Sequence, residues 1–100
     1  IGNKLVHLSF SDIRYVESYN HSIVIHQSTG NSTYYFSLSD FEKQLPAGQF
    51  ARCHNSYLVN LNGVREIGRT ELSLQSGETI PVGRAYYKAF QSAFVRYINQ

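Results

Sequence analysis

Short stretches of alternating apolar and polar residues dominate the first third of the chain. Apolar side chains fall at about every second position in residues 4–10, 13–18 and 21–27. The aromatic segment 32–37 also favours a pleated strand, and the turn-forming residues 28–31 precede it. Because two residues is the strand period, the pattern predicts a meander of four short antiparallel strands.

The period becomes helical in residues 37–45, where the apolar side chains are spaced to share one face. Either Ser37 or Ser39 can cap the start of this helix, since each has an acidic residue three positions later. Pro46 and Gly48 end it. The pattern predicts a helix of about two turns.

Strand signals return in the second half of the chain, around residues 50–53 and in residues 57–59, 64–69, 71–76 and 79–82. Gly77 joins the last two as a hairpin, and Pro81 places the last strand at a sheet edge, because proline cannot donate to the ladder. From Arg84 a terminal amphipathic helix is predicted, with its apolar face formed by Ala85, Ala89, Phe90, Ala93, Phe94, Tyr97 and Ile98.

Composition indicates one globular domain. The chain has 100 residues, of which 42% are hydrophobic and 16% charged. The single cysteine, Cys53, excludes an internal disulfide and favours a reducing, cytoplasmic location, and no apolar run is long enough to span a membrane. Methionine is absent, even at position 1, so we expect a fragment of a longer protein.

Positive charge gathers in the second half. Residues 1–50 contain three basic and four acidic residues, whereas residues 51–100 contain six basic and three acidic ones. The planar guanidinium of arginine suits phosphates and base edges. Arg84 and Lys88 lie four apart on the predicted terminal helix, an arrangement that suits an anionic partner. An ordinary solvated face would have the same composition.

The polar run Arg52 to Asn55 permits three interpretations. A metal site is not favoured, because the cysteine and the four histidines (His7, His21, His26 and His54) lack the paired spacing of zinc ligands. A catalytic pair is not favoured either, because Cys53 and His54 are adjacent and would face opposite sides of a strand. We therefore expect neither a cofactor nor an enzyme, and read Cys53 as a small buried hydrophobe.

The third interpretation is a contact loop. Asparagine pairs with adenine edges, arginine with guanine or phosphate, and serine with phosphate. The alternative is a turn that is merely capped by Asn55 or Ser56.

Four segments, in order and spacing, give the chain a family resemblance: SFSDIRYVES, SLSDFEKQL, FARCHNSYLVNLNGV and LSLQSGETIPVGRAYYKAF. The chain resembles the LytTR DNA-binding domain along nearly its whole length, and RCHNSYLVN is similar to the quorum-sensing subgroup. The resemblance implies a mainly β fold of short antiparallel sheets stacked side by side, with one short helix between strands and a C-terminal helix.

The resemblance also implies a function. Residues 1–100 would be the DNA-binding output domain of a two-component response regulator, with a receiver domain before Ile1 in the same chain. Loops from one edge would read paired direct repeats of double-stranded promoter DNA in successive major grooves and bend the duplex. A dimer on the DNA is compatible with paired repeats.

Carried over residue by residue, the base-reading positions fall on His21, Asn55 and Arg84. The resemblance also implies contacts to the DNA backbone from seven residues: Asn20, Ser22, Arg52, His54, Ser56, Tyr86 and Lys88. Gly83 departs from the serine that is often found before the arginine, so a hydroxyl contact to phosphate is lost there, although a backbone N–H could still donate. We also expect the glycine to loosen the loop that aims Arg84.

Simpler roles remain open for the three base-reading positions. His21 could be a plain strand residue, Asn55 a turn cap and Arg84 a surface charge at a helix start. Two other functions also remain open: binding of single-stranded nucleic acid by aromatic stacking, and a protein-interaction or ligand-sensing module at the edge near Pro81. We interpret most aromatic residues as core or semi-core, namely Tyr34, Tyr35, Phe36, Phe41, Phe50, Phe90 and Phe94, and leave Tyr15 and Tyr57 undecided.

Overall fold

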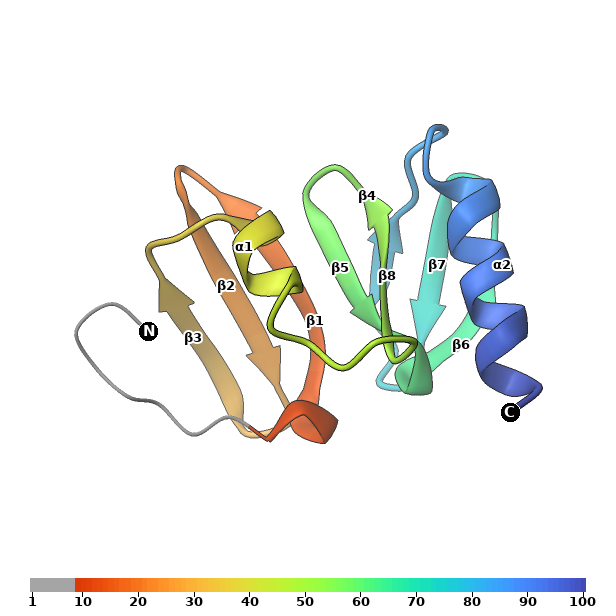
Figure 1. The fold of residues 1–100 in the computed structure, drawn as a ribbon, viewed down its shortest axis with the longest axis horizontal. Helices are drawn as coiled ribbons and strands as arrows, with labels where there is room; N and C mark the ends of the chain where they lie inside the picture. Colours follow the sequence, from red (N-terminus) through yellow and green to blue (C-terminus); the bar gives the residue numbers. More distant parts are fainter. Residues whose placement is uncertain (1–8) are drawn as a thin grey trace.

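Two antiparallel sheets form the body of the protein (Figure 1). The structure, a computed structural model, describes residues 9–100. In this part a five-stranded sheet has the order β3-β2-β1-β5-β4 and a three-stranded sheet the order β6-β7-β8. The elements are η1 (Phe10–Asp12), β1 (Ile13–Tyr19), β2 (Ser22–Gln27), β3 (Gly30–Tyr34), α1 (Leu38–Glu42), β4 (Phe50–His54), β5 (Tyr57–Asn60), η2 (Leu61–Gly63), β6 (Val64–Ile67), β7 (Glu71–Leu74), β8 (Thr79–Pro81) and α2 (Tyr87–Ile98).

This architecture confirms the predicted fold class. The sheets lie side by side, α1 falls between β3 and β4 in the chain, and α2 ends the fold (Figure 1). Pro81 belongs to β8, which is an edge strand as predicted, because β8 pairs only with β7 in its sheet.

The predicted N-terminal meander is confirmed for three of its four strands, β1, β2 and β3. Most of the first predicted strand, 4–10, lies outside the described residues, and its last residue, Phe10, begins the 3-10 turn η1 instead. The turn predicted at residues 28–31 is shorter than expected. Gly30 already pairs with Gln27 across the hairpin, so β3 begins two residues early and ends at Tyr34.

Both helices begin where backbone geometry allows. The hydroxyl of Ser37 accepts a hydrogen bond from the backbone N–H of Asp40 at 3.0 Å, so Ser37, and not Ser39, caps α1. Helix α2 begins at Tyr87 and not at Arg84. A turn precedes it, closed by the Tyr86 N–H donating to the Gly83 carbonyl at 3.0 Å. Arg84 therefore lies in a loop.

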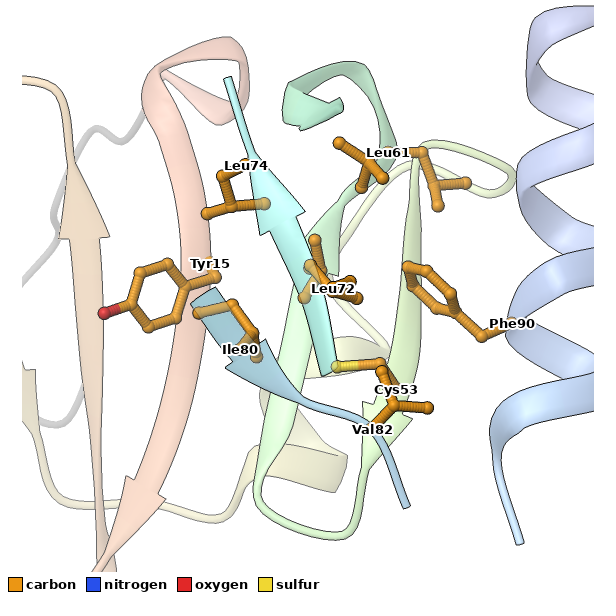
Figure 2. Packing of buried hydrophobic residues seen from close by; sticks show 10 residues of the cluster. Tyr15, Cys53, Leu61, Leu72, Leu74, Ile80, Val82 and Phe90 are labelled. Atoms are coloured by element: carbon orange, nitrogen blue, oxygen red, sulfur yellow. The ribbon is translucent and has the colours of Figure 1, made fainter. Parts of the chain in front are cut away.

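The five-stranded sheet separates two hydrophobic clusters. Leu58 of β5 faces α1 and packs with Ile23 and Phe41, whereas its neighbour Val59 faces the other way. Figure 2 shows the second cluster, in which side chains from both sheets meet Phe90 of α2. Burial on both faces explains the uninterrupted apolar run of β5.

The aromatic predictions are largely confirmed, with one clear error. Phe41 and Phe90 are buried, and Tyr34, Phe36, Phe50 and Phe94 pack against the clusters as predicted. Of the two tyrosines left undecided, Tyr15 is 9% exposed and Tyr57 packs against a cluster. Tyr35 is 84% exposed, because it follows the last residue of β3. The apolar face of α2 is also narrower than predicted, since Ala85, Ala89 and Ile98 are exposed.

An ion pair joins the two sheets. Arg14 of β1 donates to the Gln27 carbonyl and pairs with Glu78, in the connection between β7 and β8. Burial alone would raise the pKa of Glu78, but hydrogen bonds from Ser76 and Arg14 lower it below its ordinary value. Burial and the neighbouring Glu78 raise the pKa of Tyr15 to about 12.

Replacing Glu78 by glutamine is expected to lower the free energy of unfolding by about 0.5–1 kcal/mol at pH 7, the range for a partly exposed ion pair. Because the pKa of Glu78 is lowered in the folded protein, its contribution is complete above the ordinary value of 4.5 and is lost as the pH falls through the folded pKa. Urea unfolding at pH 7 and pH 3 should therefore show that the difference in free energy of unfolding between wild type and variant becomes smaller in acid. A difference of the same size at both pH values would contradict an ionic contribution from Glu78.

Candidate nucleic-acid interface

Three loops lie along one edge of the molecule: the β1–β2 turn (residues 20–21), the β4–β5 turn (55–56) and the β8–α2 loop (82–86) (Figure 1). We call this edge the loop rim. Each loop holds one predicted base-reading residue, His21, Asn55 or Arg84, and all three residues are exposed. The molecule measures 38 × 27 × 24 Å, and the three loops succeed one another along its longest axis (Figure 1).

The β1–β2 turn has an uncommon backbone. Tyr19 pairs with Ser22, which leaves Asn20 and His21 as a two-residue turn with φ of 48° and 63°. Two successive positive φ values are typical of the type I′ hairpin turn, which asparagine tolerates well and histidine less often. The prediction that His21 opens a strand is therefore wrong: His21 lies in the turn, and its side chain is exposed. Ser22 is buried, and its hydroxyl donates to the Tyr19 carbonyl at 2.6 Å.

The β4–β5 turn follows an irregularity in β4, where the register shifts between Arg52 and His54. Cys53, within this irregularity, is fully buried. The backbone N–H of Ser56 donates to His54 Nδ1 at 3.1 Å. Arg52 Nη1 donates to the Asn55 carbonyl, also at 3.1 Å. Neighbouring side chains thus hold the turn, and Asn55 is exposed at its tip.

The β8–α2 loop is anchored to β4. The Gly83 N–H donates to the Cys53 carbonyl at 2.8 Å, so this N–H is taken up within the fold. The loop is not as loose as expected, because this hydrogen bond fixes the backbone next to Arg84. A Cβ at position 83 would meet the Tyr86 ring at 3.3 Å and His54 Cδ2 at 3.6 Å. The glycine therefore allows close packing.

An open concavity of about 600 Å³ lies between the first two loops and the start of α1. It brings together six of the ten predicted DNA-contacting residues: Asn20, His21, Ser22, Arg52, Asn55 and Ser56. Its remaining lining consists of Ser18, Tyr19, Phe36, Ser37, Leu38 and Ser39. Because these residues supply hydroxyl, amide and imidazole groups and no carboxylate, the concavity suits an anionic or hydrogen-bonding ligand.

The other four predicted residues, His54, Arg84, Tyr86 and Lys88, are absent from the lining of the concavity. His54 lies against Tyr57, with ring centroids 5.5 Å apart, and close to Gly83. Arg84 and Lys88 are exposed on the β8–α2 loop and the first turn of α2. The loop rim therefore has two parts, the concavity and a basic corner.

Sequence reasoning missed a residue at this corner. Arg69 lies in the β6–β7 connection, where the Thr70 carbonyl accepts from the Val82 N–H at 2.9 Å. Its guanidinium is 5.4 Å from the centre of the Tyr87 ring at the start of α2. The sequence pattern placed Arg69 at the end of the predicted strand 64–69, whereas β6 ends at Ile67 and Arg69 lies in the turn that follows it. The hydrogen bond from Val82 to Thr70 brings this turn beside the β8–α2 loop.

The alternative chemistries gain no support from the geometry. Burial raises the pKa of Cys53 to about 12, so this residue is a thiol at neutral pH, and its Sγ is 3.5 Å from the Pro81 carbonyl oxygen. Residues 9–100 contain no group of three or more histidine, cysteine, aspartate or glutamate residues placed to hold a metal ion. Within the same range, none of the helices has the length and apolar character needed to cross a membrane.

Comparison with known proteins identifies the family. The model of the LytTr DNA-binding domain matches residues 3–94. The chain belongs to the LytTR family of DNA-binding domains. A solved LytTr DNA-binding domain of a Bacillus cereus response regulator superposes on this LytTR domain with a TM-score of 0.78 and 31% identity, covering 86% of this chain and 84% of that one.

Curated relatives of this LytTR domain are transcription regulators. The transcriptional regulatory protein BtsR of Escherichia coli (strain K12) is 33% identical over 92 residues, which are 86% of this chain and 37% of BtsR. The CO-responsive transcriptional regulator RcoM of Rhodospirillum rubrum is 29% identical over 91 residues, 85% of this chain and 39% of RcoM. The chain thus spans less than two-fifths of the length of these relatives.

Proposed function

We propose that this LytTR domain is the output domain of a two-component response regulator and that it reads double-stranded promoter DNA through the loop rim. The observation that supports this most directly is the placement of imidazole, amide and guanidinium groups in three loops along one edge (Figure 1). The molecule is 38 Å long, close to the roughly 34 Å of one turn of B-DNA. A molecule of this length, laid along the duplex, can present its loops to successive major grooves from one side.

In this proposal His21, Asn55 and Arg84 contact base edges. An asparagine amide can pair with adenine, and an arginine fork can take both acceptors of guanine. Backbone contacts come from residues exposed beside the three loops, among them Asn20, Lys88 and the newly located Arg69. Ser22 is assigned to holding the β1–β2 turn, because its hydroxyl already donates within the hairpin.

The proposal extends to the intact regulator. A receiver domain in the same chain, a cytoplasmic location and two copies on paired direct repeats complete it, with bending of the duplex as both loop-rim parts engage. A peptide quorum signal is proposed as the input, on the sequence similarity of the β4–β5 segment. The limited share of each curated relative that the chain matches, 37% for BtsR, leaves room for such a domain.

Selection from a random duplex pool, followed by footprinting of the recovered sites, tests this function. We expect recovery of paired direct repeats, with protection on one face of the duplex at two successive major grooves. Recovery of one short unpaired site would overturn the direct-repeat part of the proposal. A domain that retains no duplex at low salt would overturn DNA reading by the loop rim.

One observation favours a second candidate function, binding of single-stranded nucleic acid. Tyr19 is 68% and Tyr35 84% exposed, and both lie near the β1–β2 turn, since Tyr34 pairs with Ile23 at the same end of the sheet. Exposed aromatic rings can stack with unpaired bases. Competition between a duplex and its separated strands at equal salt distinguishes the two, and preferential release by the single strand would favour this candidate.

Replacing Lys88 by alanine is expected to reduce the slope of log affinity against log salt by roughly one unit, because one phosphate contact and its counterion are lost. The loss should be similar on specific and random duplexes. Lys43, exposed at the end of α1, provides the matched control, and its alanine variant should keep the wild-type slope. If the Lys88 variant also keeps the wild-type slope, Lys88 lies outside the interface.

A further inference from the structure

We propose that Arg52 is a positioning residue, which fixes the β4–β5 turn so that Asn55 faces the bases, and that it does not contact a phosphate. The proposal rests on the function proposed above and adds a residue that controls its specificity. Its basis is the surroundings of the guanidinium group, because the Arg52 side chain is only 17% exposed.

Three groups surround this guanidinium. Nη1 donates to the Asn55 carbonyl at 3.1 Å, and Nη2 donates to Ser39 Oγ at 3.1 Å. Nε lies 3.3 Å from Glu42 Oε1, within ion-pair distance although not aligned as a hydrogen bond. One planar group therefore connects the β4–β5 turn with two residues of α1.

This arrangement is costly to give up for a DNA phosphate. Each terminal nitrogen of Arg52 donates one of its two N–H groups within the fold, and Nε is buried. Turning outward would release the Asn55 carbonyl and would separate Arg52 from Glu42. An arginine with its charge already compensated by a carboxylate also adds little to phosphate attraction.

The helix to which Arg52 holds the turn is itself fixed by the core. Leu38 and Phe41 of α1 are buried in the cluster that contains β1 and β2, while Ser39 and Glu42 turn toward Arg52. The guanidinium of Arg52 thus connects the backbone of Asn55 to a helix whose position is fixed by its buried side chains. A loop that is fixed before binding loses less conformational entropy on the DNA, and its amide can discriminate bases.

Neutralising the acid gives a test with a distinctive sign. Removing a negative charge from a DNA-binding surface should strengthen DNA binding by simple electrostatics. If Arg52 positions Asn55, however, Glu42→Gln should weaken specific binding about three- to tenfold and leave binding to random duplex unchanged or stronger. Glu66→Gln, at an exposed position of β6, is the matched control and should not weaken specific binding.

A double-mutant cycle tests the route through Asn55. Arg52→Met should weaken specific binding about tenfold in the wild-type background and less than twofold in the Asn55→Ala background, because the group it positions is then missing. The salt slope should change no more than in Arg96→Met, which removes the same charge from the last turn of α2. Ser39→Ala, which removes one acceptor, should give a smaller loss with the same coupling.

Thermal melting confirms that each variant is folded, and Ser39→Ala with Glu42→Gln keep the test decisive if Arg52→Met unfolds. Additive losses for Arg52 and Asn55, with a slope lowered by about one unit, would overturn positioning and assign Arg52 to a phosphate. Stronger specific binding by Glu42→Gln would also overturn it. Failure of DNA reading itself would show separately, as a wild-type domain that does not discriminate its selected site from random duplex.

Discussion

Replacing Arg84 by alanine is expected to weaken binding to the selected duplex site by about 1–3 kcal/mol, roughly 5- to 150-fold. Arg84 is exposed in the β8–α2 loop, and the Gly83 N–H anchors that loop to the Cys53 carbonyl at 2.8 Å. Because the backbone of this loop is fixed, the loop cannot rearrange to bring another side chain to the bases that Arg84 contacts. Titration of labelled duplex, with the selected site and with its base pairs changed one at a time, measures the effect.

Two comparisons make this result specific. Arg96→Ala removes the same charge from the last turn of α2 and should change binding to the selected site by less than twofold. Arg84→Ala should also bind duplexes with a changed base pair at the contacted position as well as it binds the selected site. Equal affinity of Arg84→Ala and wild type for the selected site would show that Arg84 reads no base.

The periodicity of the sequence was sufficient for most of the strands and both helices, because strand and helix periods are local properties, whereas the side-by-side arrangement of the sheets was expected from the family resemblance. It located β1, β2 and the hairpin of β7 and β8, and the edge position of Pro81 followed from its missing N–H. Junctions were less accessible. Whether His21 opens a strand or occupies a turn depends on the pairing of Tyr19 with Ser22, and the start of α2 depends on the turn closed at Gly83.

The candidate site shows the same division. The polar residue types from Arg52 to Asn55 indicated a contact loop, whereas the family resemblance pointed to His21, Asn55 and Arg84 as base-reading positions. The fold sets the loops of these three residues on one edge. The role of Arg52 could not be predicted, because its partners Ser39 and Glu42 belong to a helix ten or more residues earlier and approach only when α1 packs on the sheet. Likewise, the hydrogen bond from the Gly83 N–H to the Cys53 carbonyl forms only because β4 lies beside the β8–α2 loop, and these segments are far apart in the sequence.

Replacing Phe90 by alanine is expected to cost about 3–5 kcal/mol in the free energy of unfolding. Phe90 is fully buried where α2 meets both sheets (Figure 2), so truncation leaves a cavity that neighbours such as Leu72 and Cys53 can fill only in part. For a domain of this size such a loss is a large share of total stability. Urea unfolding, followed by tyrosine fluorescence and circular dichroism, measures it.

The same substitution should also affect DNA binding, because α2 supports the β8–α2 loop that carries Arg84. At temperatures where Phe90→Ala remains folded, we expect weaker binding to the selected site and little change on random duplex. Ile98→Ala, which truncates a 58% exposed side chain on the same helix, should cost less than about 0.5 kcal/mol. Comparable losses of stability in the two variants would mean that α2 is not held through Phe90, and the basic corner of the loop rim would need another anchor.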